Sequence, residues 1–183
     1  MNLRNNWNAK DFCDRRQHTN ILSSLAAGDS LPLLLKLFAR SQFSIPPGVR
    51  DELQAGLDKG RNYLQPIFHA IAARQIEVMP LSSDEETALQ GYPQRLNLGE
   101  RQAIALAQSR NALLLSNDRR ALRYCQEQHI RTVNLVEILR LLWTRHLISQ
   151  GEVRILVAKL EQVENLVLAQ AQRRAISAPR RQN

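Results

Sequence analysis

The sequence contains little of what several common kinds of site require. Its two cysteines, Cys13 and Cys125, lie far apart, outside any CxxC pair or Cys/His cluster, so neither a disulfide framework nor a zinc site is predicted. The sequence has no GxGxxG or GxxxxGK[ST] motif, which removes the local basis for dinucleotide and P-loop nucleotide binding. No Ser or Cys nucleophile signature stands near His69, His129 or His146, so a hydrolase triad is not supported.

Long apolar runs are absent as well. The two longest, Leu31–Phe38 and Ile138–Trp143, are interrupted by Pro32, Lys36 and Arg140 long before a bilayer could be spanned. The first residues, MNLRNNWNAKDF, are polar and lack the apolar region of a signal peptide. We therefore expect a cytoplasmic protein that does not enter the membrane.

Acidic residues are outnumbered by basic ones. The chain has 25 Lys and Arg against 17 Asp and Glu, for a net charge of +8. A basic surface attracts polyanions, nucleic acid first and anionic membrane second, although many basic proteins bind neither. Aromatic residues make up 5% of the chain, which is too few to predict a platform for stacked bases.

The order of apolar patterns indicates one α/β domain. The chain has 183 residues, of which 44% are hydrophobic, enough for a core of its own. Short β-prone runs alternate with stretches of helical period, which is typical of a mainly parallel sheet with helices around it. The predicted strands are Lys10–Asp14, Gln42–Ile45, Ile76–Met79, Ala112–Ser116 and Arg131–Asn134. The predicted helical segments are 20–39, with a break near GDSLP, 47–73, with breaks at Gly60 and Pro66, 99–109, 119–128 and 135–148.

This pattern divides the chain into four parts. Residues 1–9 form an N-terminal extension, and residues 10–150 form the α/β domain. Residues 151–174 carry apolar side chains at helical spacing from Val153 to Val167, which predicts an amphipathic helix. We expect this helix to dock on the domain or on a partner, including a second copy in a homodimer. Residues 175–183 are predicted to be a flexible basic tail.

Three acidic residues fall near the carboxyl ends of predicted strands, where α/β proteins bind ligands. Asp118 follows the strand ALLLS, Glu100 lies in the first turn of the helix after NLG, and Glu52 follows IPPGVRD. Each has a plain structural explanation when it is considered alone. Asp118 can cap a helix, and the helix dipole favours Glu100, Glu52 or the neighbouring Asp51 in a first turn.

The combination of acids changes this interpretation. Several carboxylates at one sheet edge would repel one another unless a cation neutralised them, and Mg²⁺ or Mn²⁺ is the hard cation that such oxygens prefer. A bound ion of this kind can activate water and stabilise charge that develops on a phosphodiester. A basic surface around it would hold the phosphate backbone.

The acidic segments together resemble a known family. The segments IPPGVRDEL, LNLGERQAIALA and ALLLSNDRRA, followed by RTVNLVEILRLLWTRHLIS, are similar in order and spacing to the PIN domain, a metal-dependent ribonuclease fold. The similarity runs from about Asp14 to the helix near Glu164, and lies within a prokaryotic branch related to toxin nucleases. It implies a PIN-like three-layer fold with four to five mainly parallel strands between helices. It also implies that Glu52, Glu100 and Asp118 hold the metal ion.

The first motif of the family admits two alignments. The family has an Asp at the end of its first strand, then a hydroxyl residue and often Asn, where this chain reads FCDRRQHTNIL. If Thr19 and Asn20 match, His18 replaces the acid, which would weaken Mg²⁺ binding and leave activity poor or absent. If Asp14 is the acid, RRQH is an insertion. We favour Asp14 because it ends a predicted strand and keeps the charge.

Polar residues beside the acids have candidate supporting roles. Asn20 and Ser116 can orient the metal ligands or their waters, although a helix-start Asn and a strand-end Ser are equally good explanations. Arginines that flank the predicted cleft can bind phosphates, or they can form a solvated charged face. They are Arg15, Arg16, Arg119, Arg120 and Arg123.

The resemblance implies a function and an alternative. The first interpretation is a metal-dependent endoribonuclease that acts on RNA, as the toxin of a toxin–antitoxin pair restrained by an antitoxin protein. The alternative is a catalytically impaired PIN-like module that binds nucleic acid or protein, which the sequence His18-Thr19-Asn20 favours.

Overall fold

The computed structural model describes residues 21–164 and 166–178, so the predicted strand Lys10–Asp14 lies outside the described residues. The other four predicted strands are present, and they pair two by two in parallel. β1 (Ser44–Ile45) pairs with β2 (Glu77–Val78), and β3 (Leu114–Leu115) pairs with β4 (Thr132–Val133). The fold is α/β, but the described residues form two two-stranded sheets, and one central sheet of four to five strands is not seen among them.

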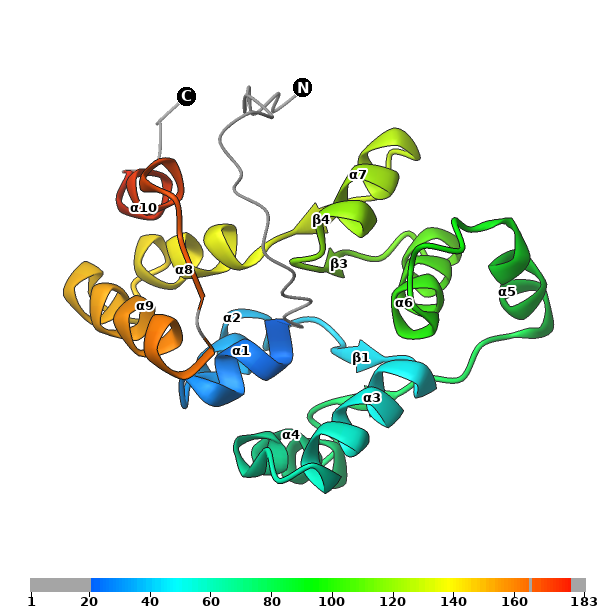
Figure 1. Cartoon of the computed structure of the whole chain (residues 1–183), viewed down its shortest axis with the longest axis horizontal. Helices are drawn as coiled ribbons and strands as arrows, with labels where there is room; N and C mark the ends of the chain where they lie inside the picture. Colours follow the sequence, from blue (N-terminus) through cyan, green and yellow to red (C-terminus); the bar gives the residue numbers. More distant parts are fainter. Residues whose placement is uncertain (1–20, 165, 179–183) are drawn as a thin grey trace.

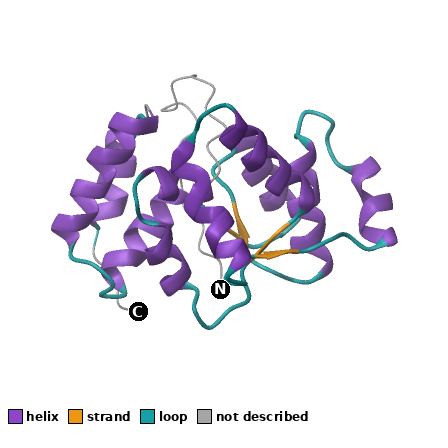
Figure 2. Ribbon diagram, turned by 90° about the horizontal axis from the view of Figure 1, so that it is seen from below, coloured by secondary structure: helices purple, strands orange, loops and turns teal. Residues whose placement is uncertain are grey.

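Among the described residues, each of the four strands has an outer edge that no other described strand pairs, and the hydrogen bonds of β1 and β3 show which residue faces it. The N–H groups of Leu114 and Ser116 donate to β4 at 2.9 and 3.2 Å, so the peptide groups of Leu115 between them face the opposite edge of β3. The carbonyl oxygens on either side of Ser44 accept from β2, both at 2.9 Å, so the peptide groups of Ser44 face away from β2. The described strands lie in the middle of the protein, with helices around them (Figure 2).

Most helices begin and end close to the predicted positions. Figure 1 shows them in sequence colours. They are α1 (Ile21–Ala27), α2 (Leu31–Leu37), α3 (Pro47–Asp58), α4 (Gln65–Ala72), α5 (Ser83–Ala88), α6 (Leu98–Ser109), α7 (Arg119–Glu127) and α8 (Leu135–Thr144), with the short 3₁₀ turns η1 (Asn62–Leu64) and η2 (Leu89–Gly91). None of these helices, nor any other described one, is long and apolar enough to cross a membrane.

α5 is absent from the predicted helices, although the sequence carries a start signal for it. Ser82 and Glu85 have the S-x-x-E spacing of a capping box, in which each side chain bonds the other's backbone N–H. The Glu85 N–H donates to Ser82 Oγ at 3.3 Å, and the Ser82 N–H donates to Glu85 Oε2 at 2.8 Å. α5 has only six residues, too short to show a helical period in its apolar positions.

The segment predicted as one C-terminal helix is instead two helices, α9 (Gln150–Glu164) and α10 (Gln170–Ser177). Between them Leu166 and Leu168 are buried whereas Val167 is 87% exposed. This alternation is that of extended chain, so the prediction of a continuous helix to residue 174 was wrong. α10 also includes residues that were assigned to the tail.

Both C-terminal helices pack on the rest of the chain. α9 buries Val153 and Leu160 completely, in the same core cluster as Leu25 of α1 and Leu139 of α8. α10 packs along α8, and the Trp143 indole N–H donates to the carbonyl oxygen of Ile176 at 2.7 Å. A second, smaller core lies between α6, α7 and β3.

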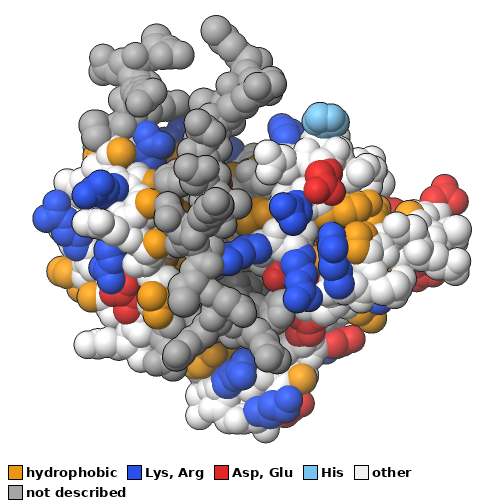
Figure 3. Space-filling model, turned by 45° about the horizontal axis from the view of Figure 1, so that its top comes forward, with side chains coloured by type: hydrophobic (Ala, Val, Ile, Leu, Met, Phe, Trp, Pro, Cys, Tyr) orange, Lys and Arg blue, Asp and Glu red, His pale blue; other side chains and the backbone are white. Residues whose placement is uncertain are grey.

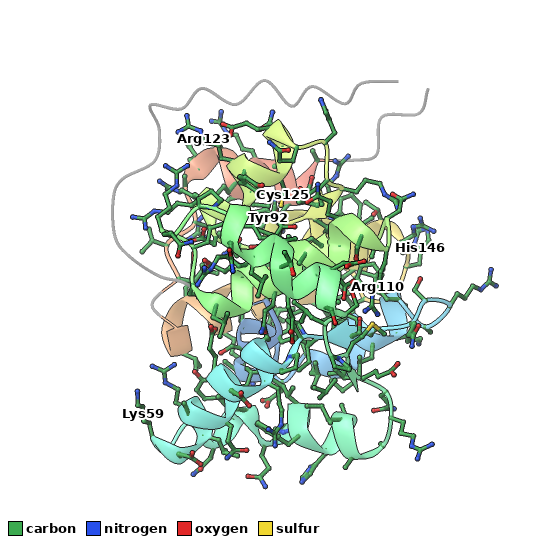
Figure 4. All side chains as sticks on the ribbon, turned by 90° about the vertical axis from the view of Figure 1, so that its right-hand side faces the viewer. Lys59, Tyr92, Arg110, Arg123, Cys125 and His146 are labelled. Carbon is green, nitrogen blue, oxygen red and sulfur yellow. The ribbon has the colours of Figure 1, made fainter. Side chains whose placement is uncertain are left out.

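The smaller core contains the described cysteine. Tyr92, Ile104 and Cys125 are buried there, and Tyr92 and Cys125 lie close together between the helices (Figure 4). The Tyr92 ring meets the Tyr124 ring edge to face at a centroid distance of 5.7 Å. Burial raises the pKa of the Cys125 thiol to about 11. The thiol therefore stays neutral and behaves as a small apolar group.

A buried carboxylate holds α5 against the end of α6. Glu85 is 6% exposed and accepts from Arg110 Nε and Nη2, both at 3.0 Å, and from the Ser109 hydroxyl. The hydrogen bonds from Arg110 are the largest cause that lowers the pKa of Glu85 from 4.5 to about 2, followed by the bond from Ser109. The ion pair therefore stabilises the folded chain at neutral pH.

Glu85→Gln should make this stabilisation visible through its pH dependence. The folded-state pKa is depressed, so the contribution is complete above about pH 4.5 and declines as the pH falls toward 2. Arg110 is partly exposed and screened by solvent, so we expect the free energy of unfolding at pH 7 to fall by about 1–2 kcal/mol. Urea unfolding at pH 7 and pH 3 measures the difference. Glu86→Gln, exposed on the same helix, is the control, and a pH-independent difference would contradict the assignment.

Candidate functional site

The site begins where β1 leads into α3. Pro46 is extended, with φ −75° and ψ 163°, and Pro47 is the first residue of α3. Proline suits this position because its fixed φ matches the helix and it lacks the N–H that would have no partner. The helix therefore starts two residues after Ile45 and carries Glu52 away from the carboxyl end of the strand within its second turn.

Two glycines bring α3 and α6 together. The Gly48 N–H donates to Gln102 Oε1 at 2.7 Å, which ties the start of α3 to α6. A Cβ atom on Gly99 would lie 2.8 Å from Glu52 Oε1 and 3.1 Å from Val49 Cγ2, closer than side chains normally allow. The missing side chain at Gly99 therefore gives the Glu52 carboxylate its place against the first turn of α6.

Glu100 is fixed in that same turn. Asn97 caps α6, where its Oδ1 accepts from the Glu100 N–H at 2.7 Å and its own N–H donates to Glu100 Oε2 at 2.9 Å. This is a complete capping box, and it explains why Glu100 stands at the third helical position. Since Glu100 follows Gly99 directly, the structure brings Glu52 and Glu100 to one turn of α6.

Asp118 begins α7 at the carboxyl end of β3. Its Oδ1 accepts from the N–H groups of Arg120 and Ala121, both at 2.8 Å, so Asp118 is an N-cap. The Asp118 N–H donates in turn to Ser116 Oγ at 3.2 Å. Ser116 thus fixes the turn that presents Asp118. α7 packs against α6, so this acid lies on an element next to the helix that carries Glu100.

The described acids have the chemistry to bind a hard cation, but they do not form a complete set of metal ligands. Carboxylate oxygens are the ligands that Mg²⁺ and Mn²⁺ prefer. Across residues 21–164 and 166–178, however, no three His, Cys, Asp or Glu side chains form a group that could hold a metal ion. The residues predicted from the first motif lie outside the described residues. They are Asp14, Arg15, Arg16, His18 and Asn20.

The arginines predicted to bind phosphate on α7 are at the surface. Arg119, Arg120 and Arg123 are exposed, and Arg120 Nη1 lies 3.5 Å from the carbonyl oxygen of Arg95 in the loop before α6. Figure 3 shows Lys and Arg side chains spread over both halves of one face, with Asp and Glu side chains between those on its right-hand half. The arrangement can attract an anion to the starts of both helices.

Three residues that support the site were not singled out from the sequence. Gly48, Gly99 and Gln102 set the distance between α3 and α6. A signal exists in the sequence, because both glycines stand in the first turn of a predicted helix although glycine has a low helix propensity. Glycine at two such positions indicates a close approach of backbone. Which helices approach each other is visible only in the fold.

Comparison with known proteins gives one match. A family model described as a PIN domain matches residues 17–178, which is most of the chain. No curated protein and no solved structure matches the chain.

Proposed function

The chain belongs to the PIN-domain family, and from this premise we propose that it is a divalent-metal-dependent endoribonuclease. PIN domains are in general nucleases that use divalent metal ions. The observation that carries the proposal is the position of Glu52 against the first turn of α6, next to Glu100. Asp118 at the carboxyl end of β3 supplies a third acid on the neighbouring helix.

In this proposal the carboxylates of Glu52, Glu100, Asp118 and Asp14 hold Mg²⁺ or Mn²⁺. Such an ion, when bound, lowers the pKa of a coordinated water and offsets negative charge on a phosphodiester. The chain's own part is to orient the ligands. The Asn97 N–H holds Glu100, and the hydroxyl of Ser116 holds the turn at Asp118, while arginines on α7 position the RNA.

We propose further that residues 10–14 complete the sheet. The peptide groups of Ser44 in β1 and Leu115 in β3 face away from their described partners, so the outer edges of β1 and β3 are open among the described strands. A parallel strand that paired with both edges would make five strands in all. Its carboxyl end would carry Asp14 to the same side of the sheet as Asp118. This is the placement that the four-carboxylate site requires.

The partners stay predictions from the family resemblance. RNA is the proposed substrate, and restraint by an antitoxin protein would follow if the chain is the toxin of a toxin–antitoxin pair. A homodimer and a cytoplasmic location are also predictions.

One observation favours a second function. Asp118 is a helix cap, Glu100 is the third helical residue of a capping box, and the described residues contain no group of three metal ligands. A catalytically impaired module that binds nucleic acid or protein would need no more than this. The choice between the two functions depends on whether the chain binds a divalent ion.

A thermal-unfolding series with the full chain tests the proposal. We expect Mn²⁺ to raise the melting temperature, because an ion that binds only the folded state adds about 2.7 kcal/mol at one hundred times its dissociation constant. Single-stranded RNA should be cleaved with Mn²⁺ or Mg²⁺ and left intact in EDTA. RNA binding without cleavage, together with no Mn²⁺-dependent stabilisation, would overturn the nuclease proposal and support the impaired module.

A further inference from the structure

Arginines from α6 and α7 both contact the loop before α6, and this loop carries a third arginine, Arg95. Arg101 Nη1 donates to Gln94 Oε1 at 3.0 Å, and Arg120 Nη1 lies 3.5 Å from the carbonyl oxygen of Arg95. Gln94 and Arg95 are adjacent in the loop between η2 and α6. The loop is therefore held between a guanidinium from α6 and another from α7. We call Arg95, Arg101 and Arg120 the loop arginines.

The loop arginines have no acidic partners among the residues that the structure describes. Other described cations do have them, as in the pairs of Arg110 with Glu85 and of Arg173 with Glu161. Placing three positive charges around one short loop costs electrostatic energy, which a bound anion would offset. Such a concentration of unpaired arginine is characteristic of a surface that binds a polyanion.

Arg101 carries a second sign of a missing ligand. Its Nε atom is shielded from solvent and has no hydrogen-bond partner in the described part of the chain, whereas its Nη1 is used by Gln94. A shielded N–H without a partner costs about 1–3 kcal/mol. Nε and Nη2 form the edge of a guanidinium whose N–H groups can donate side by side to two oxygens of a phosphate. A modest rotation of this partly exposed side chain would present that edge to an anion.

We propose that the loop arginines bind a phosphate of single-stranded RNA adjacent to the phosphate that is cleaved. This inference rests on the proposed ribonuclease function and names a binding site for its substrate. Arg101 follows Glu100 directly, and Arg120 stands two residues after Asp118, so the loop arginines flank both acids. Leu98 is 50% exposed and stands one helical turn before Arg101, where it offers an apolar surface for a ribose or base.

RNA binding by the full chain in EDTA tests the site without cleavage. The probe is a short fluorescein-labelled single-stranded RNA, and its anisotropy is measured over a series of salt concentrations. We expect Arg95→Gln and Arg120→Gln each to weaken binding by up to about 10-fold. The double variant should also make the slope of log K against log salt shallower by about 0.7, the value for one lost phosphate contact on a single strand.

Arg154→Gln is the matched control. Arg154 is exposed on α9, at the opposite end of the protein from α6 (Figure 1), and should keep the wild-type affinity and slope. Both test positions are exposed, and an unchanged melting temperature would show that the variants fold.

The binding series distinguishes the phosphate site from the ribonuclease proposal. Wild-type affinity and slope in the double variant, with cleavage intact, would overturn the phosphate site and leave the ribonuclease proposal standing. A wild-type chain that neither binds nor cleaves RNA would overturn both. Polyglutamate is compared with unlabelled RNA of equal charge as a competitor of the probe. If polyglutamate competes as effectively, the ligand of this site is an acidic protein rather than RNA.

Discussion

Asp118→Asn is expected to lower metal-dependent RNA cleavage by at least about 100-fold while leaving the stability of the chain nearly unchanged. Asparagine is as good an N-cap as aspartate, so its Oδ1 can still accept from the N–H groups of Arg120 and Ala121. What the variant loses is the negative charge. A charged carboxylate binds a divalent cation more strongly than a neutral amide oxygen does, whereas a helix cap does not need the charge.

Comparison with Asp118→Ala separates the two roles of this side chain. Removing the cap should lower the free energy of unfolding by about 1 kcal/mol, in addition to the loss of cleavage. Initial rates of RNA cleavage in Mn²⁺ and urea unfolding of both variants measure the two effects. Asp58→Asn, an exposed substitution at the end of α3, serves as the remote control. If Asp118→Asn cleaves RNA at the wild-type rate, Asp118 is a cap and nothing more.

Local structure was predictable wherever a short sequence pattern determines it. The strand positions of ALLLS and RTVN and the start of α3 after IPP follow from apolar runs and from the geometry of proline. Asp118 as a cap and Glu100 in a first turn were expected for the same reason. These features depend on neighbours within about four residues, so the sequence contains the whole signal.

The errors concern contacts between segments that are remote in the chain. Residues 151–174 keep a helical period of apolar side chains, yet the chain becomes extended near Leu166, where Leu166 and Leu168 are buried and Val167 is not. Hydrophobic period alone cannot distinguish a continuing helix from two shorter ones that pack against different neighbours. The approach of Glu52 to Gly99 could not be predicted for a similar reason. It joins α3 to α6, and the two residues are 47 positions apart in the sequence.

Acidic residues at helix starts can have two roles, one in capping the helix and one in binding a ligand. Helix starts at the carboxyl ends of strands favour acidic side chains through capping and through the helix dipole. The same position is where an α/β sheet gathers its ligands. Because both causes act at one place, the presence of Glu100 and Asp118 cannot by itself establish a metal site. Glu52 is different, because neither a cap nor a capping box accounts for its position, and the glycine opposite it is costly in a helix.

Gly99→Ala tests whether that glycine exists for the carboxylate. The new Cβ would lie 2.8 Å from Glu52 Oε1 and 3.1 Å from Val49 Cγ2, so the end of the Glu52 side chain must move. Moving the flexible carboxylate end costs little stability, and the small shift that the buried Val49 methyl group must make is offset by the gain of up to about 0.5–1 kcal/mol of alanine over glycine in a helix. We therefore expect the free energy of unfolding to stay within about 1 kcal/mol of wild type.

The activity of Gly99→Ala should respond quite differently from its stability. A displacement of about 1 Å in a ligand of the reacting centre can reduce the rate about 100-fold, so we expect cleavage in Mn²⁺ to fall by roughly that factor. Gly91→Ala is the matched control, since a Cβ there meets no atom within 4 Å, and it should leave both quantities unchanged. A stable Gly99→Ala chain that cleaves RNA at the wild-type rate would show that the position of Glu52 does not matter to the reaction. Loss of cleavage without loss of stability would mean that the close contact between α3 and α6 serves the site rather than the fold.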